Sequence, residues 1–226
     1  MQEDLPYEVE HIMPDYSLYG ITDTAYGYMT RGCPRGCFFC HVKDKEGTKS
    51  VKVADLNEFW SGQKNIILND PNTLACKDWR DILQQLIDSK AVVEFNQGID
   101  VRLCTGERLD MLNKIRLSNP HFAWDRYEDK DIVLPRFKEI AERMSIRTKA
   151  IAVYVLTNFD STIDQDIERV ETLRGLGFSP YVMRYNKQSI PRGSKLNALA
   201  RYCNNRTFLW RYGSFEEYLA HSKETH

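Results

Sequence analysis

The chain has 226 residues, with 31 Lys and Arg against 32 Asp and Glu and a formal net charge of -1. Its content of 42% hydrophobic and 12% aromatic residues is enough to build a core and excludes wholesale disorder. The balanced charge argues against a histone-like nucleic-acid binder, so nucleic acid is not indicated as a partner. No apolar run reaches the length of a membrane span, and the acidic N-terminus lacks signal-peptide features. We expect a cytoplasmic protein without a membrane partner.

Short apolar runs alternate with amphipathic stretches along the chain. Six apolar runs are expected to form strands, at residues 26–30, 65–68, 91–95, 121–124, 150–156 and 178–185. Five stretches have the apolar spacing of helices, at residues 78–89, 106–117, 131–145, 162–176 and 194–202. The helix over 131–145 is expected in spite of Pro135 near its start.

This alternation predicts an α/β fold in which parallel strands are joined by right-handed crossovers. Six strand–helix units are too few for a closed eight-stranded barrel. We therefore expect either a partial (β/α)6 TIM-like barrel or an open doubly wound sheet. One domain is predicted over 1–226, with an N-terminal extension over about 1–23 and a C-terminal cap over about 204–226.

Polar residues follow each predicted strand. In parallel sheets and barrels the chemistry gathers at the carboxyl ends of strands, so these residues outline a candidate active-site rim. They are a cysteine loop, Asn69 to Asn72, Asn96 to Arg102, Asp125 and Arg126, Thr157 and Asn158, and Arg184 to Asn186.

Three cysteines lie close together in residues 31–41, which read RGCPRGCFFCH. The C-x3-C-x2-C spacing of Cys33, Cys37 and Cys40 allows three thiolates to converge on one centre from a single loop. A cubane iron–sulfur cluster is usually held by four thiolates, so three leave one iron open for another ligand. The remaining cysteines are scattered and are expected to be buried free thiols.

The stretch CPRGCFFC resembles the cluster-binding loop of the radical S-adenosylmethionine enzymes. The resemblance implies a [4Fe-4S] cluster on Cys33, Cys37 and Cys40, with S-adenosyl-L-methionine chelating the fourth iron. Reductive cleavage of that cosubstrate would give a 5'-deoxyadenosyl radical that abstracts hydrogen from a substrate. The family also implies a six-unit partial barrel and an external one-electron donor such as flavodoxin or ferredoxin.

Further site residues are implied by position in the family. Phe39, before the third cysteine, corresponds to an aromatic residue near the adenine. A Gly-Gly-Glu-like stretch is replaced here by residues 68–72, whose oxygens are candidates for the methionine ammonium group or for an ordinary turn. The complete set of candidate cosubstrate-binding residues is Phe39, Asn69, Asp70, Asn72, Asp125, Val155, Asn158 and Met183.

The candidate substrate-binding residues are Gln97, Asp100 and Arg102. Strand alternation from Gly98 would put Asp100 and Arg102 on one face, where they bind substrate or pair with each other. The substrate itself is not readable from the sequence. Two alternatives stay open: a small activase-like radical enzyme acting on a partner protein, and a non-catalytic binding module stabilised by a cluster or by zinc, the latter with His41 as a fourth ligand.

Overall fold

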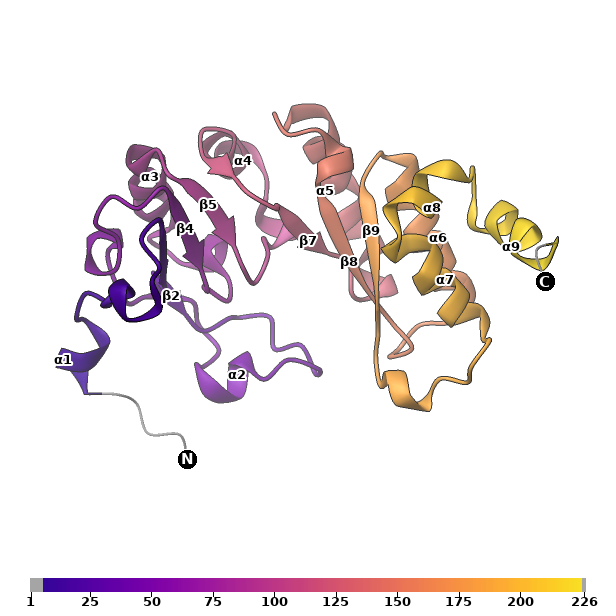
Figure 1. Ribbon diagram of the computed structural model, residues 1–226, viewed down its shortest axis with the longest axis horizontal. Coiled ribbons are helices and arrows are strands. Elements are labelled where there is room, and N and C mark those ends of the chain that lie inside the picture. The colour runs from indigo at the N-terminus through magenta and orange to yellow at the C-terminus, as the bar shows by residue number, and fades with distance from the viewer. Residues whose placement is uncertain (1–5, 225–226) are drawn as a thin grey trace. The chain divides into compact units, whose positions relative to one another are not determined.

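The computed structural model describes residues 6–224, and the chain divides into two compact units, Met1–Pro120 and His121–His226 (Figure 1). The first five residues of the expected N-terminal extension therefore lie outside the described range. Each unit is built around its own parallel sheet, and each is described separately below.

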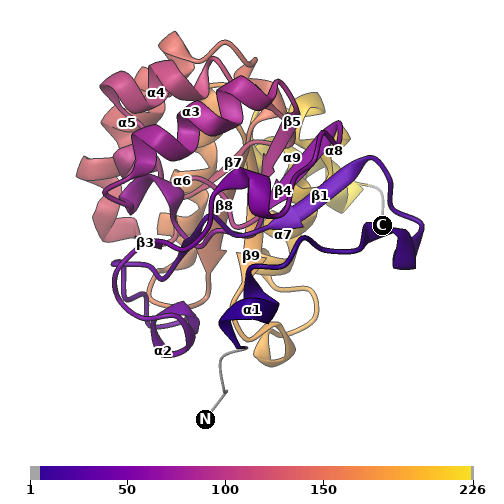
Figure 2. The same cartoon turned by 90° about the vertical axis from the view of Figure 1, so that its left-hand side faces the viewer.

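The first unit contains a parallel sheet whose spatial order follows the chain. Its strands are β1 (Thr24–Gly27), β4 (Asn65–Leu68), β5 (Val92–Phe95) and β6 (Arg116–Leu117). Ala25, Ile66 and Val93 are in register across three strands and fully buried, so this face of the sheet carries the core. The helices α3 (Trp79–Ser89) and α4 (Gly106–Leu112) contact each other and lie on one side of the sheet (Figure 2).

Between β1 and β4 in the sequence, β2 (Thr30–Arg31) pairs with β3 (Val51–Lys52) in a separate two-stranded antiparallel sheet. It encloses the loop that carries the three cysteines and the short helix α2 (Val42–Lys45). In the described part of the N-terminal segment, the first helix is α1 (Tyr7–Glu10).

The Tyr16 hydroxyl group of that segment forms hydrogen bonds with the edge strand β1. The hydroxyl of Tyr16 donates to the carbonyl oxygen of Tyr26 at 3.0 Å and accepts from the Tyr26 N–H at 2.9 Å. These are the backbone groups that an edge strand leaves without a ladder partner. The segment thus provides a partner for these two backbone groups at the edge of the sheet.

The second unit has a three-stranded parallel sheet, again in chain order. The strands are β7 (His121–Ala123), β8 (Ala152–Thr157) and β9 (Ser179–Arg184). The helices are α5 (Lys130–Arg143), α6 (Ile163–Gly175), α7 (Lys195–Asn204), α8 (Arg206–Arg211) and α9 (Phe215–Glu224). Phe215 and Tyr218 of α9 pack with Tyr202 of α7 in one core cluster, which gives the expected C-terminal cap its place in this unit.

The α/β class and the parallel pairing of strands are confirmed. The strand over 65–68 and the helix containing Pro135 also occur as expected. Neither sheet reverses its strand order, so neither contains the switch point of a doubly wound sheet.

Two predicted elements were wrong in their extent. The predicted strand over 26–30 is divided, because β1 ends at Gly27 and a separate strand begins at Thr30. The predicted helix over 106–117 ends at Leu112, because residues 116–117 form β6 and pair with Val92 and Val93. Backbone pairing with a neighbouring strand overrode the helical spacing of the side chains.

No helix within residues 6–224 combines the length and the apolar character that crossing a membrane requires.

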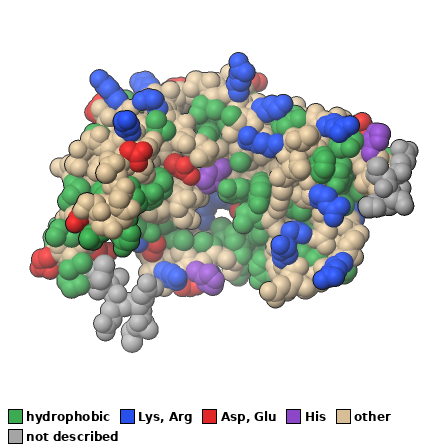
Figure 3. Space-filling model, in the orientation of Figure 1, with side chains coloured by type: hydrophobic (Ala, Val, Ile, Leu, Met, Phe, Trp, Pro, Cys, Tyr) green, Lys and Arg blue, Asp and Glu red, His purple; other side chains and the backbone are tan. Residues whose placement is uncertain are grey.

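On the face of the second unit drawn in Figure 3, Lys and Arg side chains are scattered among hydrophobic and other residues.

Candidate functional site

The cysteine loop is closed at its base by backbone geometry that requires glycine. Gly32 has φ +80°, and a Cβ atom there would lie 2.2 Å from the carbonyl oxygen of Lys49. The Glu46 carboxylate accepts a hydrogen bond from the Gly32 N–H at 3.1 Å, and the Cys33 N–H donates to the Gly47 carbonyl at 3.2 Å. The two ends of the loop are therefore held together directly beside the first cysteine.

The three predicted ligands share this loop as partly exposed cysteines that are in no disulfide. A hydrogen bond from the Cys40 N–H to the Cys37 carbonyl at 3.1 Å makes a turn between two of them. No group of three or more His, Cys, Asp or Glu side chains in the described residues is arranged to hold a metal ion. The loop thus provides the donors without gathering them around one point. In number, chemistry and access, three reduced thiols fit a [4Fe-4S] cluster with one open iron.

The two aromatic residues of the loop differ in their surroundings. Phe38 is 86% exposed, with the Lys43 ammonium group 5.5 Å from its ring centroid. Phe39, the predicted adenine neighbour, is half-buried. Side-chain exposure alternates along the loop, so Phe39 faces the protein and Phe38 faces solvent.

Asn72 is a buried polar residue in contact with Cys33. It is 5% exposed, and its Nδ2 donates to the Sγ of Cys33 at 3.7 Å and to the Oδ2 of Asp100 at 3.0 Å. Its Oδ1 is buried and has no hydrogen-bond partner among the described residues. A buried amide oxygen without a donor is unusual in folded proteins and marks a place where an N–H group would bind favourably.

Asp100 lies between two arginines. Its Oδ2 accepts from Arg35 Nε at 2.5 Å, and its Oδ1 accepts from Arg102 Nε at 2.9 Å. Burial raises the pKa of the Asp100 carboxyl, but the Arg102 charge and the hydrogen bonds from both arginines outweigh it and hold the pKa below the ordinary 3.8. Since Arg35 stands between Cys33 and Cys37, the ion pair ties the cysteine loop to the loop that follows β5.

The predicted alternation from Gly98 was wrong. Residues Val101–Leu103 form a 3-10 turn, and Asp100 accepts from the Arg102 N–H at its start at 3.2 Å. This turn brings Asp100 and Arg102 together, and they pair with each other. Mutual pairing is one of the two roles that the sequence allowed, the other being substrate binding. Gln97 is exposed.

Asn69 and Asp70 bind other parts of the protein. The Asp70 carboxylate is 2% exposed and accepts from the Met29 N–H at 2.7 Å and from the Thr30 hydroxyl at 2.8 Å. Burial raises the pKa of Asp70, although these donors oppose the shift. Asn69 accepts from the Asn96 side chain at 2.8 Å. Asp70 thereby supports the segment that leads into the cysteine loop.

The other four predicted cosubstrate residues belong to the second unit. Val155 is fully buried and in register with buried Val182, so its side chain is part of the core. Met183 is 46% exposed, and Asp125 follows β7 with intermediate exposure. Asn158 adopts φ +61° and donates from Nδ2 to the Tyr185 carbonyl at 3.0 Å.

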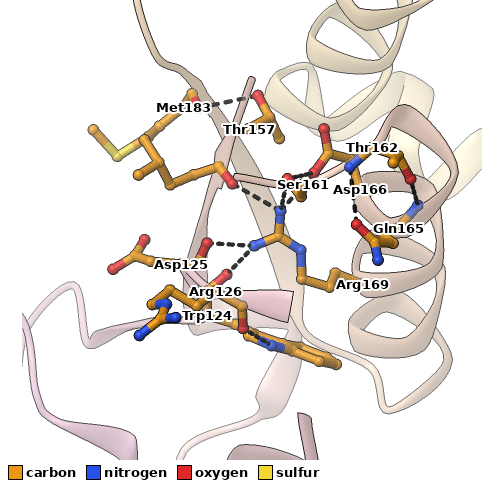
Figure 4. A network of polar contacts seen from close by, with 11 residues as sticks. Trp124, Asp125, Arg126, Thr157, Ser161, Thr162, Gln165, Asp166, Arg169 and Met183 are labelled. Atoms are coloured by element: carbon orange, nitrogen blue, oxygen red, sulfur yellow. Dashed lines mark hydrogen bonds and ion pairs between the residues drawn. The ribbon is translucent and has the colours of Figure 1, made fainter. Parts of the chain in front are cut away.

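Sequence reasoning missed Arg35 as a member of the first unit's cluster. It also missed the buried Arg169 in α6, which binds the carboxyl ends of β7 and β8 (Figure 4). A signal for Arg169 was present, because Asp166, Arg169, Val170 and Leu173 have the spacing of one buried helix face. Nothing comparable marks Arg35, whose partner is 65 residues away.

A scan against protein-family models finds no family that matches this chain, and a search of curated proteins finds no match to its sequence.

Proposed function

We propose that this protein is a radical S-adenosylmethionine enzyme, with Cys33, Cys37 and Cys40 as the ligands of a [4Fe-4S] cluster. The observation that carries the proposal is the C-x3-C-x2-C loop, whose three partly exposed cysteines are in no disulfide, and the buried Asn72 amide beside Cys33. The partial (β/α)6 barrel belongs to the same proposal and is supported by the consecutive strand order within each sheet.

When bound, the cluster supplies the electron that cleaves S-adenosylmethionine to methionine and a 5'-deoxyadenosyl radical. The protein's part is to hold and orient the cosubstrate and to position the substrate. Asn72 supports this role because its unpartnered Oδ1 can accept a hydrogen bond from an ammonium group such as that of the methionine moiety.

Asp100 and its arginines have a second role in this proposal. Two guanidinium groups, those of Arg35 and Arg102, donate to this one buried carboxylate beside the cysteine loop. Guanidinium groups are also the donors that a polar substrate group such as a carboxylate or phosphate binds best. Gln97 is assigned to substrate binding on its exposure and its place in the same loop. The substrate is a small molecule or, for an activase-like enzyme, a partner protein; a flavodoxin or ferredoxin is the proposed electron donor.

Iron incorporation into cysteine variants tests the proposal. The full chain and its Cys37→Ala variant are reconstituted anaerobically with iron and sulfide, and bound iron, sulfide and zinc are quantified. We expect about four irons per wild-type chain and a broad visible absorption, as a cubane cluster requires. We expect a severe loss of both in Cys37→Ala.

Cys76→Ala is the matched control, because it removes a thiol that is 1% exposed and lies outside the loop. It should keep wild-type iron content. Iron at the wild-type level in Cys37→Ala contradicts the ligand assignment. A colourless protein that instead binds one zinc per chain supports the binding-module alternative.

A further inference from the structure

The side-chain amide nitrogen of Asn72 has two acceptors in the first unit. It donates to the Sγ of Cys33 at 3.7 Å and to the Oδ2 of Asp100 at 3.0 Å, and the side chain is only 5% exposed. A primary amide has two N–H bonds, so these two contacts use both of them. One N–H bond of Asn72 is therefore directed at a sulfur atom of the cysteine loop.

Asp100 determines which end of the amide faces Cys33. Its carboxylate is ion-paired with Arg35 and Arg102 and can only accept hydrogen bonds. Turning the amide by half a rotation would place the Asn72 Oδ1 against this carboxylate and against the sulfur, so that acceptors would face acceptors. The orientation in which the nitrogen faces both groups is therefore the stable one.

The backbone holds both partners of the N–H···S contact in place. The Cys33 N–H donates to the Gly47 carbonyl at 3.2 Å, at the base of the loop. The Asn72 carbonyl accepts from the Ser50 hydroxyl at 2.8 Å and from the Ala75 N–H at 3.2 Å. Ser50 directly precedes β3, which pairs with β2 ahead of Cys33. The contact thus depends on the closed base of the loop and not on its tip.

A hydrogen bond to a sulfur ligand changes how easily an iron–sulfur cluster takes up an electron. The donor withdraws negative charge from the sulfur and so favours the reduced, more negative state, which raises the reduction potential. The effect is stronger at a buried contact, where little water screens it.

We infer that Asn72 raises the reduction potential of the cluster by donating a hydrogen bond to the Cys33 sulfur. The inference rests on the proposed function, because Cys33 is a cluster ligand only in that proposal. It goes beyond the proposal by giving the Asn72 nitrogen a role separate from that of its oxygen. A purely structural role for Asn72 would alter stability and leave the potential unchanged.

The test is the midpoint potential of the cluster in the reconstituted full chain, without S-adenosylmethionine. Anaerobic redox titration followed by electron paramagnetic resonance measures the fraction of reduced cluster. Asn72→Leu keeps the approximate size of the side chain and removes both N–H bonds. Asn69→Leu is the matched control, since it removes an amide three residues earlier that binds Asn96 instead of a cysteine.

At a fixed solution potential, we expect the ratio of reduced to oxidised cluster to be at least tenfold lower in Asn72→Leu than in wild type. A tenfold change corresponds to a downward shift of about 59 mV for one electron. Asn69→Leu should change the ratio by less than threefold.

Equal ratios in Asn72→Leu and wild type, or equal decreases in both variants, overturn the inference. Because the cluster is then present, the proposed cluster ligands stand. A wild-type chain that takes up no cluster overturns the proposed function and the inference with it.

A measurement without any change at residue 72 covers the case in which Asn72→Leu does not fold or hold a cluster. The full chain is produced with asparagine labelled with ¹⁵N at the side-chain amide, and the reduced cluster is examined by electron spin echo spectroscopy. We expect a ¹⁵N coupling in wild type that persists in Asn69→Leu. No coupling in the labelled wild-type protein contradicts the inferred hydrogen bond.

Discussion

The Asp100 carboxylate accepts hydrogen bonds from Arg35, Arg102 and Asn72, and its side chain is only 6% exposed. These contacts favour the ionised form in the folded state, so the pKa of Asp100 lies below its unfolded value of 3.8. A lowered carboxyl pKa contributes stability that is fully present above the unfolded value. That contribution disappears as the pH falls through the folded value.

Asp100→Asn should therefore reduce the free energy of unfolding at pH 7 by about 1–3 kcal/mol, the usual cost of losing charge-assisted hydrogen bonds in a partly buried site. The difference between wild type and variant should shrink as the pH is lowered below 3.8, where the wild-type carboxylate becomes protonated. Urea denaturation at a series of pH values from neutral to acid measures this. A difference that stays constant over that range would show that the Asp100 charge contributes nothing.

At the residue scale, local sequence patterns pointed to the candidate residues. The three cysteines are recognisable from their spacing, and Asp100 with Arg102 from their polar character after a strand. Arg35 was not recognisable as their partner, because its contact with Asp100 depends on how two distant loops fold together. Likewise, no sequence pattern distinguishes Asn72, whose buried Oδ1 has no partner within residues 6–224, from Asn69, which binds Asn96.

Among the elements, the cysteine loop depends most on one backbone conformation. Gly32 combines φ +80° with a site where a Cβ atom would lie 2.2 Å from the Lys49 carbonyl oxygen. Gly36, in the same loop, has φ +57° but open space around its Cβ position. Substitutions at the two glycines therefore distinguish two energetic costs. Both would place a side chain on a left-handed backbone, but only the one at Gly32 would also cause a steric clash.

Gly36→Ala should cost about 1–2 kcal/mol of stability, the price of a left-handed conformation with a side chain. Gly32→Ala should cost more, because the base of the loop must also move away from Lys49. We expect iron binding after reconstitution to fall clearly in Gly32→Ala and to stay near wild type in Gly36→Ala. Urea denaturation and iron analysis of both variants measure these effects, and equal losses would contradict the role given to the Gly32 contact.

The elements themselves show where sequence patterns suffice. The strand over 65–68 was predicted with its observed bounds, because a short apolar run ends in a strong turn signal. The helix predicted over 106–117 was too long, because Ile115 continues the apolar spacing although residues 116–117 pair with β5. Apolar periodicity reports burial, and both a helix and a following strand can bury the same residues.

For the whole molecule, alternating strand and helix patterns predicted the α/β class and the parallel pairing, and both are observed. Right-handed crossovers and short connections leave few other arrangements for such a sequence. The closing contacts of each unit were less predictable. Tyr16 at the edge of β1 and Arg169 at the carboxyl ends of β7 and β8 both bind backbone groups. Helical spacing marks Arg169 as part of a buried face, but no side-chain pattern shows which carbonyl groups it binds.

We propose that this chain uses a cluster on its three loop cysteines to cleave S-adenosylmethionine. The most direct test of this proposal is to incubate the reconstituted, dithionite-reduced full chain with S-adenosylmethionine and to quantify 5'-deoxyadenosine and methionine by chromatography. Cleavage proceeds slowly without substrate in our account, so both products should accumulate in equal amounts with wild type and be absent with Cys37→Ala. A fully reconstituted and reduced wild-type protein that forms no 5'-deoxyadenosine would contradict the account.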